Sequence, residues 1–97
     1  MAAWISEKGD VLEIRLGKSG QLIQRQDVHD WVGPGFAIFY LNAEWLMLAD
    51  PSAKGTGRSR NIKAIELVRV SVLEPLAEIF GDVLIVHRDE ISFDDLL

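Results

Sequence analysis

Glycine and proline divide this chain into short apolar segments, and this punctuation limits the folds that it can adopt. The segments between the breaks are about five to eight residues long, a length typical of strands rather than helices. We therefore expect an α+β fold that is mainly antiparallel β, as a curled sheet or a partly open barrel with one or two short helices. The breaks are Lys8-Gly9, Gly17 to Gly20, Gly33 to Gly35, Asp50-Pro51, Gly55 to Gly57 and Gly81-Asp82.

The size and composition of the chain predict one small globular domain over residues 1–97. A chain of 97 residues has room for one hydrophobic core. Its hydrophobic fraction of 48% is too high for a disordered chain. No signal-peptide pattern is present, and the most apolar window, residues 36–49, is too short to cross a bilayer. We expect a soluble, cytoplasmic protein without a membrane partner.

The chain contains no cysteine, which excludes disulfides, thiolate zinc sites and cysteine nucleophiles. The lack of cysteine leaves the redox compartment open. Serine-nucleophile motifs, a P-loop and a dinucleotide-binding fingerprint are also absent from the sequence. We therefore expect no bound cofactor or metal, and we favour a non-catalytic protein over an enzyme.

Apolar and polar residues alternate from Val11 to Leu16, which predicts a strand with one buried face. A turn at Lys8-Gly9 is expected to pair this strand with residues 3–5. A second turn, at Gly17 to Gly20, is expected to bring residues 22–23 alongside and complete a three-stranded meander. The predicted pairs are Ile5 with Leu12 and Ala3 with Ile14.

Residues 36–49 are apolar along nearly their whole length and fit either a buried helix or a hairpin of two strands. Ala, Leu, Met and Glu favour a buried helix, and periodicity alone does not separate the two for a run of this length. We favour a hairpin around Asn42-Ala43-Glu44, because the first half is aromatic and β-branched and Gly33-Pro34-Gly35 precedes it. The predicted pairs are Phe39 with Met47, Tyr40 with Leu46, Ile38 with Leu48 and Leu41 with Trp45.

The second half of the chain begins with another ambiguous segment. Residues 62–73 match a helical stripe, but the run Val-Arg-Val-Ser-Val favours a strand from about Glu66. The elements expected after it are a short helix over Glu74 to Phe80, a buried strand over Val83 to His87, and a terminal helical stub capped by Ser92.

Residues 54–63 contain four basic residues and no acidic one. Glycine N–H groups and Arg side chains in such a loop can bind an anion, so Lys54, Arg58 and Arg60 are candidate anion-binding residues. The glycine spacing is not that of a P-loop. A solvated surface loop accounts for the same composition.

Acidic residues concentrate at the other end of the chain. From Glu74 onward there are seven acidic residues and one basic residue, and the whole chain has a net charge of -5. This balance argues against nucleic acid as a partner, because phosphates repel it. It favours a basic protein partner, as for an acidic protein that masks a nuclease-like toxin, or a contact between the acidic end of one copy and the basic loop of another.

Each of the two histidines lies near carboxylates in the sequence. His29 lies between Asp27 and Asp30, and His87 precedes Asp89-Glu90. Brought together, these groups would form a divalent-metal site or an acid–base pair, which is the basis of an enzyme alternative. Their spacing matches no metalloprotease, EF-hand or deaminase pattern. Packing of His87 at the end of an apolar strand is the simpler interpretation.

The excess of apolar residues is the strongest indication of function. A domain of this size leaves about two fifths of its unfolded surface exposed, so both faces of segment 36–49 are difficult to bury within one chain. We therefore expect a non-catalytic interaction domain that forms a homodimer or higher oligomer. Complete coverage within one chain is the alternative. The expected interface residues are Trp31, Phe36, Phe39, Tyr40, Trp45 and Met47.

A second functional hypothesis is a small-molecule or anion-binding domain. Its pocket would lie between the sheet and a helix. Trp31, Phe36 and Trp45 would line this pocket, and Arg58 or Arg60 would contact an anion.

Overall fold

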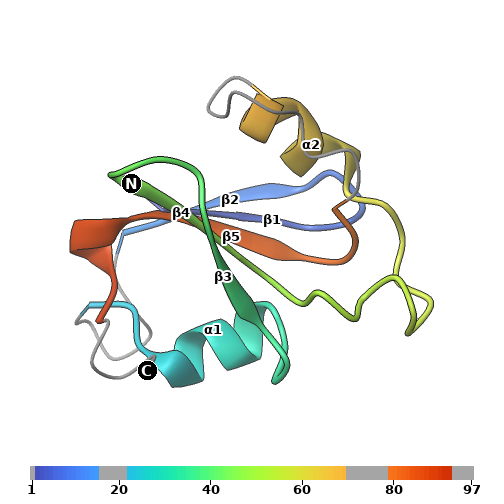
Figure 1. The fold of residues 1–97 in the computed structure, drawn as a ribbon, viewed down its shortest axis with the longest axis horizontal. Helices are drawn as coiled ribbons and strands as arrows, with labels where there is room; N and C mark the ends of the chain where they lie inside the picture. The colour runs from blue at the N-terminus through green and yellow to red at the C-terminus, as the bar shows by residue number, and fades with distance from the viewer. Residues whose placement is uncertain (1, 16–21, 70–78, 93–97) are drawn as a thin grey trace.

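The computed structural model describes residues 2–15, 22–69 and 79–92, which form one antiparallel sheet and two short α-helices (Figure 1). The strand order is β2-β1-β5-β4-β3. The prediction of a mainly antiparallel α+β fold is confirmed, and the sheet is open rather than closed into a barrel. The elements are β1 (Ala2–Ile5), β2 (Val11–Ile14), α1 (Arg25–Trp31), β3 (Ala37–Tyr40), β4 (Trp45–Ala49), α2 (Ile62–Arg69), β5 (Val83–His87) and a 3-10 turn (Arg88–Glu90).

The hairpin predicted for residues 36–49 is confirmed together with its register. Its turn is fixed by Asn42, whose Oδ1 accepts hydrogen bonds from the backbone N–H groups of Glu44 and Trp45, both at 2.8 Å. This side-chain bridge favours a turn over a continuing helix. The strand pairs are Ala37 with Ala49, Ile38 with Leu48, Phe39 with Met47 and Tyr40 with Leu46.

β1 and β2 also form a hairpin, but the register predicted for it is wrong by one residue. Ile5 faces Val11 instead of Leu12. Ser6 sets this register: its backbone N–H donates to the carbonyl O of Asp10 at 2.8 Å, and its Oγ accepts from the N–H of Asp10 at 3.1 Å. These bonds close a loop one residue shorter than the predicted one. The remaining pairs are Ala2 with Ile14, Ala3 with Glu13 and Trp4 with Leu12.

The third strand expected beside this hairpin is wrong. Ile23 forms an isolated parallel bridge with Ile91, and residues 16–21 lie outside the described part of the chain. β1 pairs instead with β5, so that Trp4 faces Leu84. Because β5 also pairs with β4, the last described strand lies in the centre of the sheet and joins the two hairpins.

The strand favoured from Glu66 is wrong as far as residue 69, because α2 occupies this stretch. Asn61 precedes the helix, and its Oδ1 accepts a hydrogen bond from the N–H of Ala64 at 3.0 Å. Its Nδ2 donates to the carbonyl oxygens of Ile5 and Gly81, at 3.0 and 2.8 Å. These long-range bonds fix the start of the helix and outweigh the local β propensity. Residues 70–73 lie outside the described part.

The other expected elements have mixed outcomes. The buried strand from Val83 to His87 is confirmed. The expected helix does not reach Phe80, which forms an isolated bridge with Arg60; residues 74–78 are outside the described part, as are residues 93–97 of the expected terminal stub. The stretch around His29, for which no element was predicted, belongs to α1.

The two helices lie on opposite faces of the sheet (Figure 1). One core cluster joins Val28 of α1 to Leu84, and a second joins Ile65 of α2 to Val83. We call these two sides the α1 face and the α2 face. Successive residues of a strand alternate between faces, so β4 and β5 contribute to both clusters.

Candidate interaction surface

Two of the residues expected at an interface lie on the α1 face. Trp31 and Phe36 are partly buried and pack against the core cluster on that side. The carbonyl O of Trp31 also accepts a hydrogen bond from the indole N–H of Trp4, at 2.8 Å. This bond fixes the end of α1 against β1. Both aromatic side chains therefore contribute to the core beneath α1.

The other four expected residues lie in the β3–β4 hairpin. Phe39 and Trp45 pack, partly buried, against the cluster on the α2 face. Met47 lies on the same face and is 3% exposed, whereas Tyr40 is 70% exposed. The structure therefore brings Phe39, Trp45 and Met47 together, and it does not gather all six residues in one patch.

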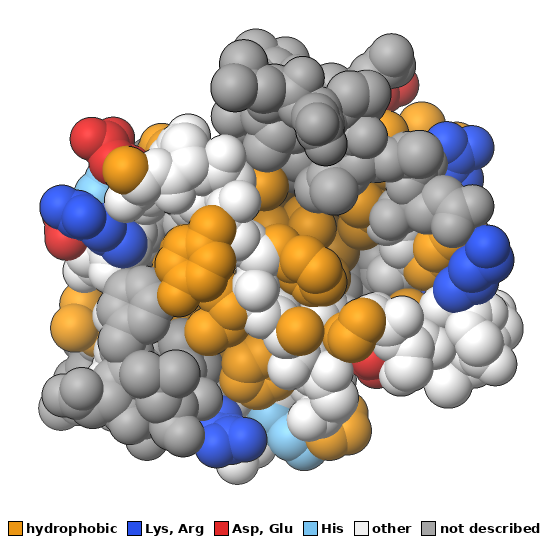
Figure 2. Space-filling model, in the orientation of Figure 1, with side chains coloured by type: hydrophobic (Ala, Val, Ile, Leu, Met, Phe, Trp, Pro, Cys, Tyr) orange, Lys and Arg blue, Asp and Glu red, His pale blue; other side chains and the backbone are white. Residues whose placement is uncertain are grey.

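α2 covers only part of its own face of the sheet. Ile5 and Val83 are fully buried there, whereas Phe39, Trp45 and Ile85 on the same face are only partly buried. Figure 2 shows hydrophobic side chains that lie together at the surface over the strands in the middle of the view. We call Phe39, Trp45 and Ile85 the open face.

Sequence reasoning missed Ile85 as a member of this surface. The run from Val83 to His87 was expected only to be a buried strand. The β4–β5 register places Ile85 opposite Met47. The period-two alternation of the strand separates Ile85 from Leu84 and Val86. Only the strand order, however, shows which face of the sheet Ile85 belongs to.

His87 borders the open face. It lies opposite Trp45 in the ladder, and the two rings meet edge to face with centroids 5.2 Å apart. Its Nδ1 accepts a hydrogen bond from the backbone N–H of Asp89 at 3.2 Å. Packing of His87 at the end of its strand is thus confirmed.

β3 and β2 form the two edges of the sheet. β3 has the sequence Ala-Ile-Phe-Tyr and carries no charge and no proline, whereas β2 carries Glu13, which is exposed. Edge strands are commonly protected from pairing with other chains by charge, proline or a bulge. β3 is therefore the less protected edge, and Phe39 connects it to the open face.

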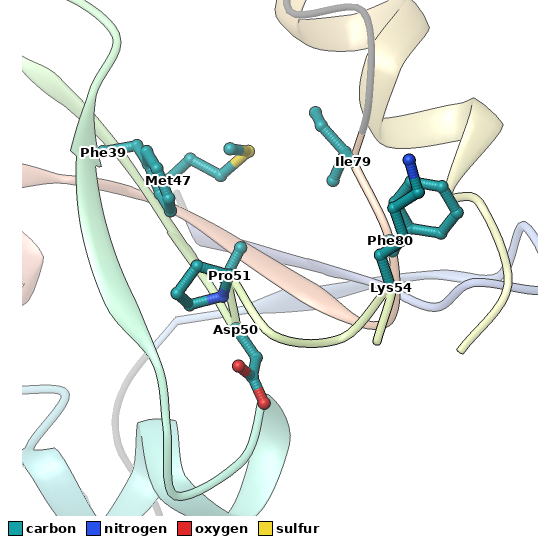
Figure 3. Close-up of a pocket in the computed structure, with 8 residues that line it drawn as sticks. Phe39, Met47, Asp50, Pro51, Lys54, Ile79 and Phe80 are labelled. Carbon is teal, nitrogen blue, oxygen red and sulfur yellow. The ribbon is translucent and has the colours of Figure 1, made fainter. Parts of the chain in front are cut away.

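A pocket of about 90 Å³ lies at one end of the open face (Figure 3). Phe39 and Met47 of the hairpin line one side, and Lys54, Ile79 and Phe80 line the other. Pockets for drug-sized ligands usually measure about 300 Å³ or more. This pocket therefore suits a side chain or a small fragment.

The basic loop is tied to acidic residues from two other segments. Arg58 Nε donates to Glu7 Oε1 at 2.8 Å, and Arg58 Nη2 lies 3.3 Å from Asp82 Oδ2. The second Glu7 oxygen accepts from the backbone N–H of Ser59. The bond from Ser59, together with that from Arg58, lowers the pKa of Glu7 below its ordinary value.

The three candidate anion-binding residues therefore have different surroundings. Arg58 is held between two carboxylates, and its hydrogen bond to Glu7 raises the pKa of the guanidinium. Lys54 Nζ lies 5.6 Å from the ring centroid of Phe80. Arg60 forms its backbone bridge with the same Phe80. An anion would have to compete with Glu7 and Asp82 for Arg58.

The two histidines lie in separate local networks. His29 Nδ1 is 3.7 Å from Asp30 Oδ1 on α1, whereas His87 contacts Trp45 and Asp89. Asp27 is buried and accepts a hydrogen bond from the N–H of Gln24 at 3.0 Å, so it caps α1. Within residues 2–15, 22–69 and 79–92, no group of three His, Asp or Glu side chains is placed to hold a metal ion.

None of the described helices is long and apolar enough to span a membrane. Comparisons with models of protein families, with curated proteins and with solved structures gave no match.

Proposed function

We propose that this chain is a non-catalytic, cytoplasmic interaction protein whose first partner is a second copy of itself. The observation that carries this proposal is the coincidence of an uncharged edge strand, β3, with the only partly buried apolar surface beside it, the open face. Phe39 belongs to both, and Tyr40 at the end of β3 is 70% exposed. Aromatic residues are enriched at the centres of protein interfaces, and an exposed apolar edge invites pairing with another chain.

A basic protein is the second partner that we propose. The net charge of -5 would attract a basic surface and speed its association. Titration of the protein with a basic partner at low and high salt tests this part, because charge steering weakens as salt is added.

Sedimentation velocity over about 1 to about 100 μM tests self-association, because this range covers a dimer of micromolar affinity. We expect the mass to rise from that of one chain to that of two. A single chain throughout this range would overturn the proposal.

A pair of matched variants locates the contact. Tyr40 and Leu12 lie on the two edge strands, are 70% and 55% exposed, and both fall on the α1 face by register. Tyr40→Lys is expected to weaken the dimer by about tenfold or more, since a charge at an edge opposes pairing. Leu12→Lys is expected to leave the dimer unchanged.

The pocket beside Lys54 favours one other function, the binding of a small ligand. Its aromatic lining and the Lys54 ammonium would suit a small aromatic anion. A thermal-shift series with benzoate and inorganic phosphate tests this alternative, because a ligand that binds the folded state raises the melting temperature. No shift with either probe would count against it.

A further inference from the structure

The hydrogen-bonding direction of each residue in β3 can be derived from the hairpin. The N–H of Leu41 donates to the carbonyl O of Trp45 at 3.0 Å. Hydrogen-bonded and non-hydrogen-bonded pairs alternate along an antiparallel ladder, so Phe39 is also in a hydrogen-bonded pair with β4. The backbone N–H and C=O groups of Ile38 and Tyr40 therefore point away from β4, toward the open edge.

This edge is available to another strand. β4 is the only neighbour of β3 in the strand order of the described residues. None of the described residues outside the β3–β4 ladder forms a backbone hydrogen bond with Ile38 or Tyr40. An unpaired row of donors and acceptors is a template for strand addition.

Charge selects this edge for contact between two copies. Each copy carries a net charge of -5, so two copies repel each other overall. β3 adds no charge to a contact, whereas pairing through β2 would bring Glu13 of each copy toward the joint. Like charges directly opposite each other across strands are destabilising.

We propose that β3 strands from two copies pair antiparallel about a two-fold axis that passes beside Phe39. This inference rests on the proposed self-association and specifies its geometry. Ile38 of one copy lies opposite Tyr40 of the second copy, and Phe39 lies opposite Phe39. The two sheets join into one, and the two open faces become continuous.

The register follows from the number of hydrogen bonds that each alternative allows. Only Ile38 and Tyr40 within β3 have outward-pointing backbone groups. Pairing Ile38 with Tyr40 uses both of these residues in each copy. Pairing Ile38 with Ile38, or Tyr40 with Tyr40, uses one strand residue from each copy and leaves the other without a strand partner. The favoured register also places Phe39 against Phe39 at a non-hydrogen-bonded pair, where side chains approach most closely.

The lack of natural cysteine makes single-cysteine variants clean probes of this register. In the proposed dimer, the Cα atoms of the two residues 39 are about 4.5 Å apart, within the range for a disulfide. Residue 37 lies on the same strand and the same face, but its two copies are about 13 Å apart along the paired strands. Phe39→Cys should therefore form disulfide-linked dimers under mild oxidation, at least about tenfold faster than Ala37→Cys.

A second pair of variants avoids dependence on the Phe39 side chain. When Ile38→Cys and Tyr40→Cys copies are mixed, their cysteines lie opposite each other at about 5.5 Å between Cα atoms. The mixture should cross-link faster than either variant alone. Circular dichroism on each variant confirms that the fold is retained before cross-linking is compared.

The outcomes separate the register from the underlying proposal. A wild-type dimer whose Phe39→Cys and Ala37→Cys variants cross-link equally slowly, with no gain from the mixed pair, would overturn β3 pairing and leave self-association standing. Rapid cross-linking of Glu13→Cys in its place would assign the contact to β2. A monomeric wild type would overturn both.

Discussion

The rings of Trp45 and His87 meet edge to face at the border of the open face, with centroids 5.2 Å apart and planes at 90°. The two residues face each other on β4 and β5. Such aromatic pairs contribute about 0.5–1.5 kcal/mol beyond the area that they bury. This contact therefore holds the surface of the open face in place.

A double-mutant cycle measures this contact. For Trp45→Ala and His87→Ala we expect a favourable coupling of about 1 kcal/mol in the free energy of unfolding, measured by urea denaturation. The control cycle combines Trp45→Ala with Leu12→Ala, since β2 lies about 14 Å from β4 across the sheet. The control pair should be additive, and equal coupling in both cycles would contradict a specific ring contact.

Asn61 should be among the residues most sensitive to substitution. It is fully buried, and the three hydrogen bonds of its side chain join β1, α2 and the turn before β5. Asn61→Ala is expected to lower the free energy of unfolding by about 3 kcal/mol, because the helix loses its cap and two buried carbonyls lose their donor.

Asn61→Asp separates the two roles of this side chain. A carboxylate retains the acceptor that caps α2, but it would turn an acceptor oxygen toward the carbonyls of Ile5 and Gly81. We expect Asn61→Asp to be at least as destabilising as Asn61→Ala in urea denaturation at neutral pH. A stability close to wild type would show that the cap matters more than the two carbonyl contacts.

The Glu7–Arg58 ion pair should make stability depend on pH on the acidic side. The pKa of Glu7 is lowered in the folded state, first by the hydrogen bond from Ser59 and then by that from Arg58. A carboxylate with a lowered pKa stabilises the fold above its unfolded-state pKa, and this contribution is lost as the pH falls through the folded-state value. As the pH falls below 4.5, the ordinary pKa of a glutamate, stability should therefore decrease more steeply in wild type than in Glu7→Gln.

Glu13→Gln is the control for this measurement, because Glu13 is exposed on β2. Thermal melting at a series of acidic pH values gives the slope of stability against pH for each variant. We expect Glu13→Gln to follow the wild type. A Glu7→Gln variant with the same acid slope as wild type would contradict a stabilising role for this ion pair.

The sequence contained enough local information to predict the second hairpin. Asn42 provides the turn, and the apolar residues on both sides of it leave a single register that matches large side chains across the strands. The strand from Val83 to His87 was equally clear, because β-branched residues dominate it. Both elements depend on residues close together in the chain.

The errors arose where distant residues decide the structure. The Asn61 side chain bonds to Ile5, 56 residues away, and thereby begins a helix in a stretch where valine favoured a strand. The register of the first hairpin is the exception, because Ser6 shortens its loop by local hydrogen bonds with Asp10 that the glycine turn signal did not indicate. The position of β5 between β1 and β4 depends on pairing between the two ends of the chain, which no local pattern records.

The candidate sites, too, depend on residues that are far apart in the chain. Arg58 was expected at an anion, but its Nε bonds to Glu7, 51 residues away. No spacing in the sequence connects these two residues. The open face was predictable only as an excess of apolar residues, and its membership required the register of β3, β4 and β5.

Salt dependence distinguishes an apolar contact between copies from a charged one. If the copies meet at β3, the two copies repel each other because each carries a net charge of -5, and salt screens this repulsion. We expect the dimer to become tighter between about 0.05 and about 0.5 M NaCl. A contact between the basic loop of one copy and the acidic end of another would instead weaken. Sedimentation equilibrium at several salt concentrations shows whether the dimer becomes tighter or weaker as salt is added.

Proline substitution tests the direction of the backbone groups in β3 without depending on side-chain chemistry. Proline removes one N–H donor and is tolerated on an edge strand where that donor points to solvent. The N–H of Tyr40 points to the open edge, so Tyr40→Pro should retain the fold and lose the dimer. The N–H of Phe39 points to β4, so Phe39→Pro should lower the urea midpoint of unfolding sharply. A stable Tyr40→Pro variant that dimerises as tightly as wild type would contradict a dimer that depends on hydrogen bonds from the Tyr40 N–H.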